Sequence, residues 1–215
     1  MRKIKIISFG PGNPALLTDR ARNAIKECEI IYGSKRLLPF IDKGISKKII
    51  TGNLDKILDK ILATFKQKQI GVLVTGDGGF HSFARNIIEQ AGRQNCELYC
   101  GISAMQYAFN KLMIPWEDAF FLNLHKSSRV DLKAILAQHA KIGILTRDEN
   151  TCHQIFFQIG KELIRNRKIF ILENLSYENE KITELSADTF EDYKSSALNI
   201  IIILDKKFLQ FNFYW

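Results

Sequence analysis

The chain has 215 residues, 46% of them hydrophobic and 25% charged, which is the composition of a folded globular protein with a sizeable core. Its 31 Lys and Arg against 23 Asp and Glu give a net charge of +8, which indicates either a solvated basic surface or an anionic partner. The chain has no apolar run near the roughly 20 residues of a membrane span and no block of five or more basic residues, so we expect neither a membrane nor a nucleic acid as its partner.

The first half of the chain alternates apolar strand-like segments with stretches of helical periodicity. After a strand that begins at Ile4, we predict strands at residues 29–32, 48–51, 70–74 and 97–100. Helices are predicted at residues 15–27, 54–65 and 104–112, and a further helix after the turn at 76–79 is predicted to end at about residue 91. This alternation is typical of a parallel sheet covered by helices, and it predicts an α/β domain over residues 1–114.

A second α/β domain is predicted over residues 118–215, after an interruption of the pattern at Pro115. Its strands are expected at residues 119–124, 142–146, 168–172, 181–185 and 199–204, and its helices at 130–139 and 151–164. The last two strands follow each other without a long helix, which predicts a mixed sheet. The aromatic tail, residues 208–215, is expected to pack in a core or a subunit interface, or else to stack on a ring-shaped ligand.

Three glycine turns follow strands of the first domain: Gly10-Pro11-Gly12, Gly76 to Gly79, and Gly101-Ile102-Ser103. The carboxyl ends of parallel strands share one edge of the sheet, where ligands bind, so we expect the turns to converge there. Pro11 and Pro14 have no backbone N–H, and this argues against a cradle for pyrophosphate. An NADP-dependent oxidoreductase is nevertheless an alternative, because Lys35 and Arg36 stand where a 2′-phosphate would be recognised.

Asp77 lies within the second of these turns. A carboxylate there repels phosphate and favours an ammonium, a sulfonium or the hydroxyls of a ribose. The alternative is that the Asp77 side chain forms a turn with its own backbone.

The remaining reactive residue types show no metal-binding or nucleophilic motif. His81 and His125 stand at strand ends, where a substrate contact is plausible, whereas His139 and His153 are expected on helices as surface or packing residues. The four cysteines show no Cys-x-x-Cys, so we expect reduced thiols in a cytoplasmic protein and no bound metal. We therefore expect that any reaction this chain performs needs no protein nucleophile.

The segments 9–18, 76–80 and 101–104 resemble, in order and separation, the three signatures of the tetrapyrrole (corrin/porphyrin) methylase family. Further likeness at residues 32–38, 79–82, 115–118, 124–125 and 173–177 is to the members of the family that methylate precorrin rings in cobalamin synthesis. The alternatives within this fold are a methylase that acts at another ring carbon and an RNA-modifying methylase.

The resemblance implies two α/β domains with the active site in the cleft between them, and a homodimer. It implies S-adenosylmethionine as methyl donor, bound by residues of both domains: Gly10, Pro11, Gly76, Asp77, Phe80, Ser103, Ala104, Leu124, Asn174, Leu175, Ala197 and Leu198. The substrate is expected to be an anionic tetrapyrrole, in keeping with the charge of +8. Its candidate contacts are Ser34, Lys35, Arg36, His81, Ser82 and His125. A separate partner enzyme that methylates C15 and removes a carboxylate is also possible.

Overall fold

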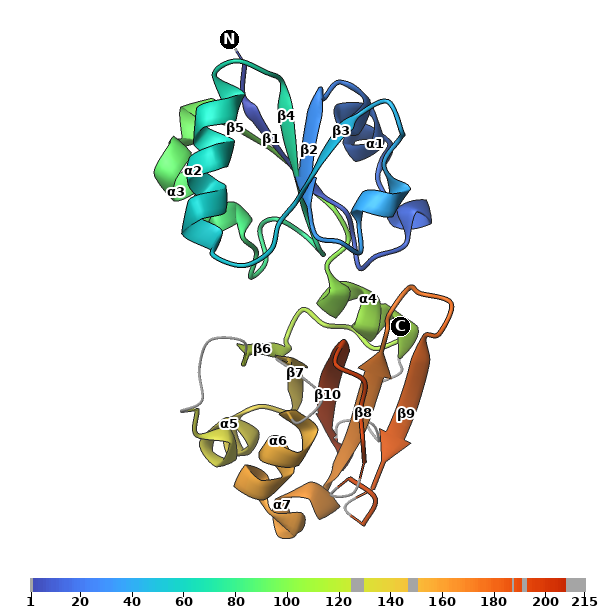
Figure 1. Ribbon diagram of the computed structural model, residues 1–215. Helices are drawn as coiled ribbons and strands as arrows, with labels where there is room; N and C mark the ends of the chain where they lie inside the picture. The colour runs from blue at the N-terminus through green and yellow to red at the C-terminus, as the bar shows by residue number, and fades with distance from the viewer. Residues whose placement is uncertain (1, 125–129, 147–150, 187, 191–192, 208–215) are drawn as a thin grey trace. The chain divides into compact units, whose positions relative to one another are not determined.

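The computed structural model describes residues 2–124, 130–146, 151–186, 188–190 and 193–207. The chain divides into two compact units, Met1–Ala104 and Met105–Trp215, and each contains a five-stranded sheet (Figure 1). The candidate residue His125, with Lys126 beside it, and the aromatic tail at 208–215 lie outside the described residues.

The sheet of the first unit is entirely parallel, with the strand order β3-β2-β4-β1-β5. Its strands are β1 (Ile4–Ser8), β2 (Ile30–Gly33), β3 (Ser46–Ile49), β4 (Ile70–Val74) and β5 (Cys96–Tyr99). Its helices are α1 (Asp19–Lys26), α2 (Leu54–Phe65) and α3 (Ala84–Ala91), with short 3₁₀ turns at Pro14–Leu16, Leu38–Phe40 and Arg93–Asn95. The parallel sheet predicted from the alternation of strand and helix is therefore confirmed.

Helices cover both faces of this sheet (Figure 1). Ile4 and Ile6 of β1 pack in a core with α2 and α3, whereas Ile7 packs in a second core with α1. Because successive side chains of a strand point to opposite faces, an apolar strand such as β1 can fill both cores at once.

The first helix begins later than the sequence pattern indicates. Residues 15–27 were expected to be helical, but Pro14–Leu16 forms a 3₁₀ turn and α1 starts at Asp19. Two caps cause the break: the Asn13 side chain accepts a hydrogen bond from the Ala15 amide, and the Thr18 hydroxyl accepts one from the Ala21 amide. The 3₁₀ turn between these caps lies next to the first glycine turn, since a Cβ on Gly10 would stand 3.7 Å from the Leu16 Cβ.

The sheet of the second unit is mixed, as predicted, with the order β6-β7-β10-β8-β9 and one parallel pair, β6 with β7. Its strands are β6 (Phe120–Asn123), β7 (Lys141–Leu145), β8 (Arg167–Glu173), β9 (Lys181–Leu185) and β10 (Asn199–Asp205). The helices are α4 (Ala104–Lys111), α5 (Leu132–Gln138), α6 (Thr151–Ile159) and α7 (Lys161–Arg165). The single helix predicted at 151–164 is wrong, because Gly160, with φ of +79°, separates α6 from α7.

Helix α4 packs with the second unit. The sulfur of Met105 lies so close to Gly143 that a Cβ on that glycine would stand 2.4 Å from it. The ring of Phe109 lies 6.1 Å from that of Phe121, centroid to centroid. The division between the compact units falls after Ala104, the first residue of α4, whereas the domain boundary inferred from the sequence, at 114–118, stays a prediction. None of the helices in the described residues is long and apolar enough to cross a membrane.

Candidate functional site

The first and second glycine turns are joined by a reciprocal pair of backbone hydrogen bonds. The Gly10 amide donates to the Gly76 carbonyl over 3.1 Å, and the Gly76 amide donates to the Gly10 carbonyl over 2.7 Å. Gly10 has φ of +76° and Gly76 has φ of +72°, which is the left-handed region where a side chain is strained. Both glycines are therefore required by the backbone that brings the two turns together.

The third glycine turn is bound to the second through Asp77. One carboxylate oxygen of Asp77 accepts from the Gly79 amide over 2.8 Å, and the other accepts from the Gly101 amide over 2.9 Å. The expected convergence of the three turns is thus a feature of the first unit. The first of these bonds is the local turn that the sequence left open as an alternative for Asp77, and the second reaches across the sheet edge.

Ser8, the last residue of β1, is a further component of this edge that the sequence pattern did not single out. Its side chain is 1% exposed, and its hydroxyl accepts a hydrogen bond from the Gly78 amide over 2.8 Å. A Cβ on Gly101 would stand 2.7 Å from the Ser8 Cβ, so the third turn passes directly over this residue. The available signal was a lone hydroxyl at the end of an otherwise apolar strand, just before the first turn.

The remaining candidates of the first unit lie close to these turns. A Cβ on Gly76 would stand 3.6 Å from the Ala104 amide nitrogen and 3.7 Å from the Ser103 Cα. Phe80 and His81 have their ring centroids 4.6 Å apart, and His81 adopts a left-handed backbone with φ of +50°. Such a conformation in a residue other than glycine is uncommon and is concentrated at functional sites.

Ser82 has a structural role, since its hydroxyl accepts from the Ala84 amide at the start of α3. Ser34, Lys35 and Arg36 directly follow β2, the strand beside β4. Lys35 and Arg36 are exposed. The Ser34 hydroxyl oxygen is buried and has no hydrogen-bond partner among the described residues. A buried hydroxyl without a partner is costly, which makes Ser34 a candidate for contact with a ligand.

The candidates of the second unit share one edge of the mixed sheet. Leu124 follows β6, and its amide donates to the carbonyl of Leu145, the last residue of β7. Asn174 follows β8, and its amide donates to the Leu198 carbonyl over 2.9 Å. Since Leu198 precedes β10, this bond brings together segments that lie 24 residues apart in the chain. Asn174 also has a left-handed backbone, with φ of +48°.

The turn after β8 is stabilised by Glu180. Its carboxylate accepts from the Ser176 amide over 2.6 Å, and it forms an ion pair with Lys111 over 2.6 Å. Partial burial acts to raise the pKa of Glu180, but the hydrogen bonds from Lys111 and the Ser176 amide outweigh it and hold the pKa below its ordinary value. The hydrogen bond to Glu180 in turn raises the pKa of Lys111. Ser176, with φ of +71°, is therefore kept in a strained turn by a charged partner.

Three of the four cysteine thiols are poorly suited to nucleophilic attack. Burial raises the pKa of Cys28 to about 11 and also raises the pKa values of Cys96 and Cys152. All four cysteines are free, and Cys100 is the exposed one. His139 packs its ring on Phe120, with the centroids 4.2 Å apart, which agrees with the packing role expected for it. Among the described residues, His, Cys, Asp and Glu form no group of three or more that could hold a metal.

The comparisons with known proteins agree on one family. The family model of the tetrapyrrole (corrin/porphyrin) methylases matches residues 3–191. A curated relative, a probable cobalt-precorrin-7 C(5)-methyltransferase of Methanocaldococcus jannaschii, is 32% identical over 205 residues, which cover 93% of this chain and 96% of the relative.

Two solved structures show the same fold. A precorrin-6Y methylase of cobalamin biosynthesis from Archaeoglobus fulgidus superposes with a TM-score of 0.72 at 23% identity, over 94% of this chain and 97% of its own. The uroporphyrin-III C-methyl transferase of Thermus thermophilus, complexed with S-adenyl homocysteine, reaches a TM-score of 0.78 at 15% identity, over 97% of this chain and 100% of its own.

Proposed function

Because the chain belongs to the tetrapyrrole methylase family, we propose that it is an S-adenosylmethionine-dependent C-methyltransferase that methylates C5 of precorrin-7 or cobalt-precorrin-7 in cobalamin biosynthesis. The ring carbon is inferred from the archaeal relative, which matches over nearly its whole length. A relationship confined to the fold would support neither a particular reaction nor a particular substrate.

The observation that carries the proposal is the joining of the three glycine turns, the first to the second through Gly10 and Gly76 and the second to the third through Asp77. A carboxylate at the centre of this edge disfavours a phosphate and favours a ligand that carries positive charge and hydroxyl groups. The Asp77 oxygen that accepts from Gly101 also receives the Ser8 hydroxyl over 3.5 Å, but the oxygen that accepts from the Gly79 amide has a second lone pair, so the carboxylate can still receive a hydrogen bond. S-adenosylmethionine fits these requirements, since it has an ammonium, a sulfonium and a ribose but no phosphate.

We assign the methyl donor to the two sheet edges as the family resemblance implies. In the first unit its contacts would be Gly10, Pro11, Gly76, Asp77, Phe80, Ser103 and Ala104. In the second unit they would be Leu124, Asn174, Leu175, Ala197 and Leu198. When bound, the donor supplies an electrophilic methyl group attached to a positively charged sulfur.

The tetrapyrrole would be held by the residues that follow β2. Lys35 and Arg36 are exposed and can pair with ring carboxylates, and the unpartnered Ser34 hydroxyl can donate to one of them. The ring carbon is itself the nucleophile in such a reaction, so the raised thiol pKa values are no obstacle. The work of this chain is to align the two ligands and to exclude water.

The assembly and the location of the protein are further parts of the proposal. A homodimer and a separate C15-methylating, decarboxylating enzyme follow from the family resemblance. The free cysteines support a reducing compartment, for which we propose the cytoplasm.

Isothermal titration calorimetry tests the donor assignment without any tetrapyrrole. The purified protein should bind S-adenosylhomocysteine and S-adenosylmethionine, and it should bind ATP and NADPH at least about 100-fold more weakly, because both place phosphates beside Asp77. Binding of NADPH without binding of S-adenosylmethionine would overturn the proposal in favour of an oxidoreductase.

A further inference from the structure

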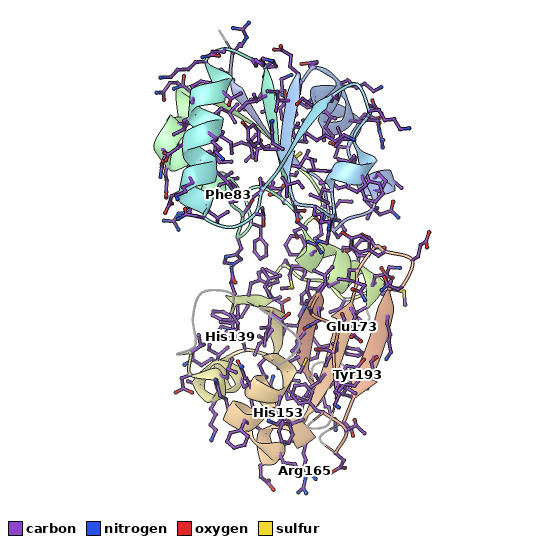
Figure 2. All side chains as sticks on the ribbon, viewed as in Figure 1. Phe83, His139, His153, Arg165, Glu173 and Tyr193 are labelled. Atoms are coloured by element: carbon purple, nitrogen blue, oxygen red, sulfur yellow. The ribbon has the colours of Figure 1, made fainter. Side chains whose placement is uncertain are left out.

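Glu173, the last residue of β8, has a buried carboxylate that holds a segment of chain ahead of β10. The residue is 5% exposed. One oxygen accepts from the Ser196 amide over 2.5 Å, and the other accepts from the Tyr193 hydroxyl. Figure 2 labels both residues in the second unit, Glu173 at the end of β8 and Tyr193 in the segment before β10. Because a buried carboxylate is costly without such donors, its presence implies that this arrangement is specified.

The segment held in this way is Ser195 to Leu198, and several further bonds define its course. The Asn199 side-chain amide donates to the Ser196 carbonyl over 2.7 Å, and the Ser196 hydroxyl donates to the Leu198 carbonyl over 3.1 Å. That carbonyl also receives the Asn174 amide. The peptide of Ser196 is therefore fixed on its N–H side by Glu173 and on its carbonyl side by Asn199.

The residues next to this fixed peptide are the ones assigned to the methyl donor. Ala197 is exposed and Leu198 is half-buried, so both offer surface to a ligand while the preceding residue is anchored. Both oxygens of Glu173 are occupied, one by the Ser196 amide of the segment and the other by the Tyr193 hydroxyl just before it. Glu173 can thus act on a ligand through the segment.

We propose that Glu173 is a positioning residue for the methyl donor, setting the backbone of Ser196 to Leu198 through the Ser196 amide. This inference rests on the proposed function, because it takes Ala197 and Leu198 as donor contacts. Tyr193 belongs to the same hydrogen-bond network. Its hydroxyl lies 3.0 Å from the Thr183 hydroxyl of β9 and so joins the Glu173 carboxylate to the next strand.

Two variants of Glu173 test the proposal. Glu173→Ala removes the acceptor of the Ser196 amide, so amide hydrogen exchange at Ser196 should speed up by at least about tenfold and the Kd for S-adenosylhomocysteine should rise about tenfold. At saturating donor, kcat and the KM for the tetrapyrrole should stay within about twofold. Glu173→Gln keeps one oxygen for the Ser196 amide, and its NH₂ group can donate to Tyr193, so it should restore most of the donor affinity.

A matched control is Glu184→Ala on the adjacent strand β9. Glu184 is a half-exposed carboxylate paired with Lys168 over 3.0 Å, and its removal should leave both the exchange at Ser196 and the donor Kd unchanged. If Glu173→Ala fails to fold, the same measurements are made on Tyr193→Phe. It removes one donor to the carboxylate and should raise the donor Kd about two- to fivefold without raising the tetrapyrrole KM.

Two results would overturn the proposal. One is an unchanged donor Kd in folded Glu173→Ala. The other is a parallel rise in donor Kd and tetrapyrrole KM, with faster exchange throughout the second unit, which would make Glu173 a general stabilising residue. If the wild-type protein does not bind S-adenosylhomocysteine, the proposed function fails, and the exchange at Ser196 still decides whether Glu173 holds the segment.

Discussion

The amide nitrogen of Gly101 lies 2.9 Å from a carboxylate oxygen of Asp77, so a single side chain joins the turns that follow β4 and β5. The other oxygen of the same carboxylate accepts the Gly79 amide. Asp77 therefore organises the candidate donor edge before any ligand arrives, and a substitution there has two consequences that can be measured separately.

The Asp77→Ala variant should lose both stability and donor affinity. Two hydrogen bonds to a charged acceptor disappear, so the free energy of unfolding should fall by about 1–3 kcal/mol. The loss of the charge near the bound ammonium or ribose should raise the Kd for S-adenosylhomocysteine by about 5- to 100-fold. Urea denaturation and calorimetry measure the two effects. A stability loss with an unchanged Kd would mean that Asp77 serves the fold alone.

The close approach of Gly101 to Ser8 should make the third turn intolerant of a side chain. In Gly101→Ala the new Cβ would meet the Ser8 Cβ at 2.7 Å and the Ser8 carbonyl oxygen at 3.1 Å, so the turn must move. We expect a lower melting temperature and a donor Kd raised by about tenfold or more.

Gly44→Ala is the matched control, because a Cβ there meets nothing within 4 Å. It should leave both the melting temperature and the donor Kd unchanged. Equal effects of the two alanines would contradict the argument from close packing.

Charge reversal at Lys35 and Arg36 should act on the tetrapyrrole and not on the methyl donor. The double variant Lys35→Glu, Arg36→Glu adds repulsion toward ring carboxylates, so the tetrapyrrole KM should rise at least about tenfold at low salt while the donor Kd stays within about twofold. Lys66→Glu, Lys68→Glu makes the same change of charge at two exposed lysines before β4, at the opposite edge of the sheet. If both double variants raise KM equally, net charge and not position is responsible.

The Glu180–Lys111 pair should make the stability of the second unit depend on pH on the acid side. The pKa of Glu180 is lower in the folded chain than in the unfolded chain, where it is about 4.3. The stability that the ionised Glu180 contributes is therefore fully present above about pH 4.3 and is lost as the pH falls through the lower, folded pKa. Glu180→Gln should reduce the free energy of unfolding at pH 7 by about 1 kcal/mol or less, because the pair is partly exposed.

Denaturation curves from pH 7 to pH 3 measure this effect. The difference between wild type and Glu180→Gln should shrink as the pH falls, and Lys111→Met should show the same convergence. If the difference in unfolding free energy between wild type and Glu180→Gln is constant over this range, the charge of Glu180 does not contribute to stability.

The sequence predicted the sheet edge well because the rules that place it are local. Apolar strands such as Ile70–Val74, each followed by glycine, are sufficient to predict where the turns of a parallel sheet lie. The bonds that make the edge rigid were not predictable, because they join residues such as Ser8 and Gly78, which are 70 positions apart. The same holds for Glu173, whose partner Ser196 is 23 positions away.

The errors at helix boundaries have a different physical origin. Hydrophobic periodicity continues from Ala15 into α1, but the caps at Asn13 and Thr18 divide this stretch into a 3₁₀ turn and a helix. Gly160 likewise interrupts an amphipathic pattern that reads as one helix. In both places the polar and glycine signals were present, and they outweighed the apolar pattern.

The most direct test of the account is the position of the transferred methyl group. Purified protein, S-adenosylmethionine labelled with ¹³C in its methyl group, and cobalt-precorrin-7 or precorrin-7 should give a product heavier by one methyl group, with a single enriched ¹³C resonance. Through-bond correlations should place that carbon on C5 of the ring. A methyl group at another ring carbon would contradict the assigned substrate and reaction, and the absence of any labelled product from either substrate, with the donor bound, would contradict the account as a whole.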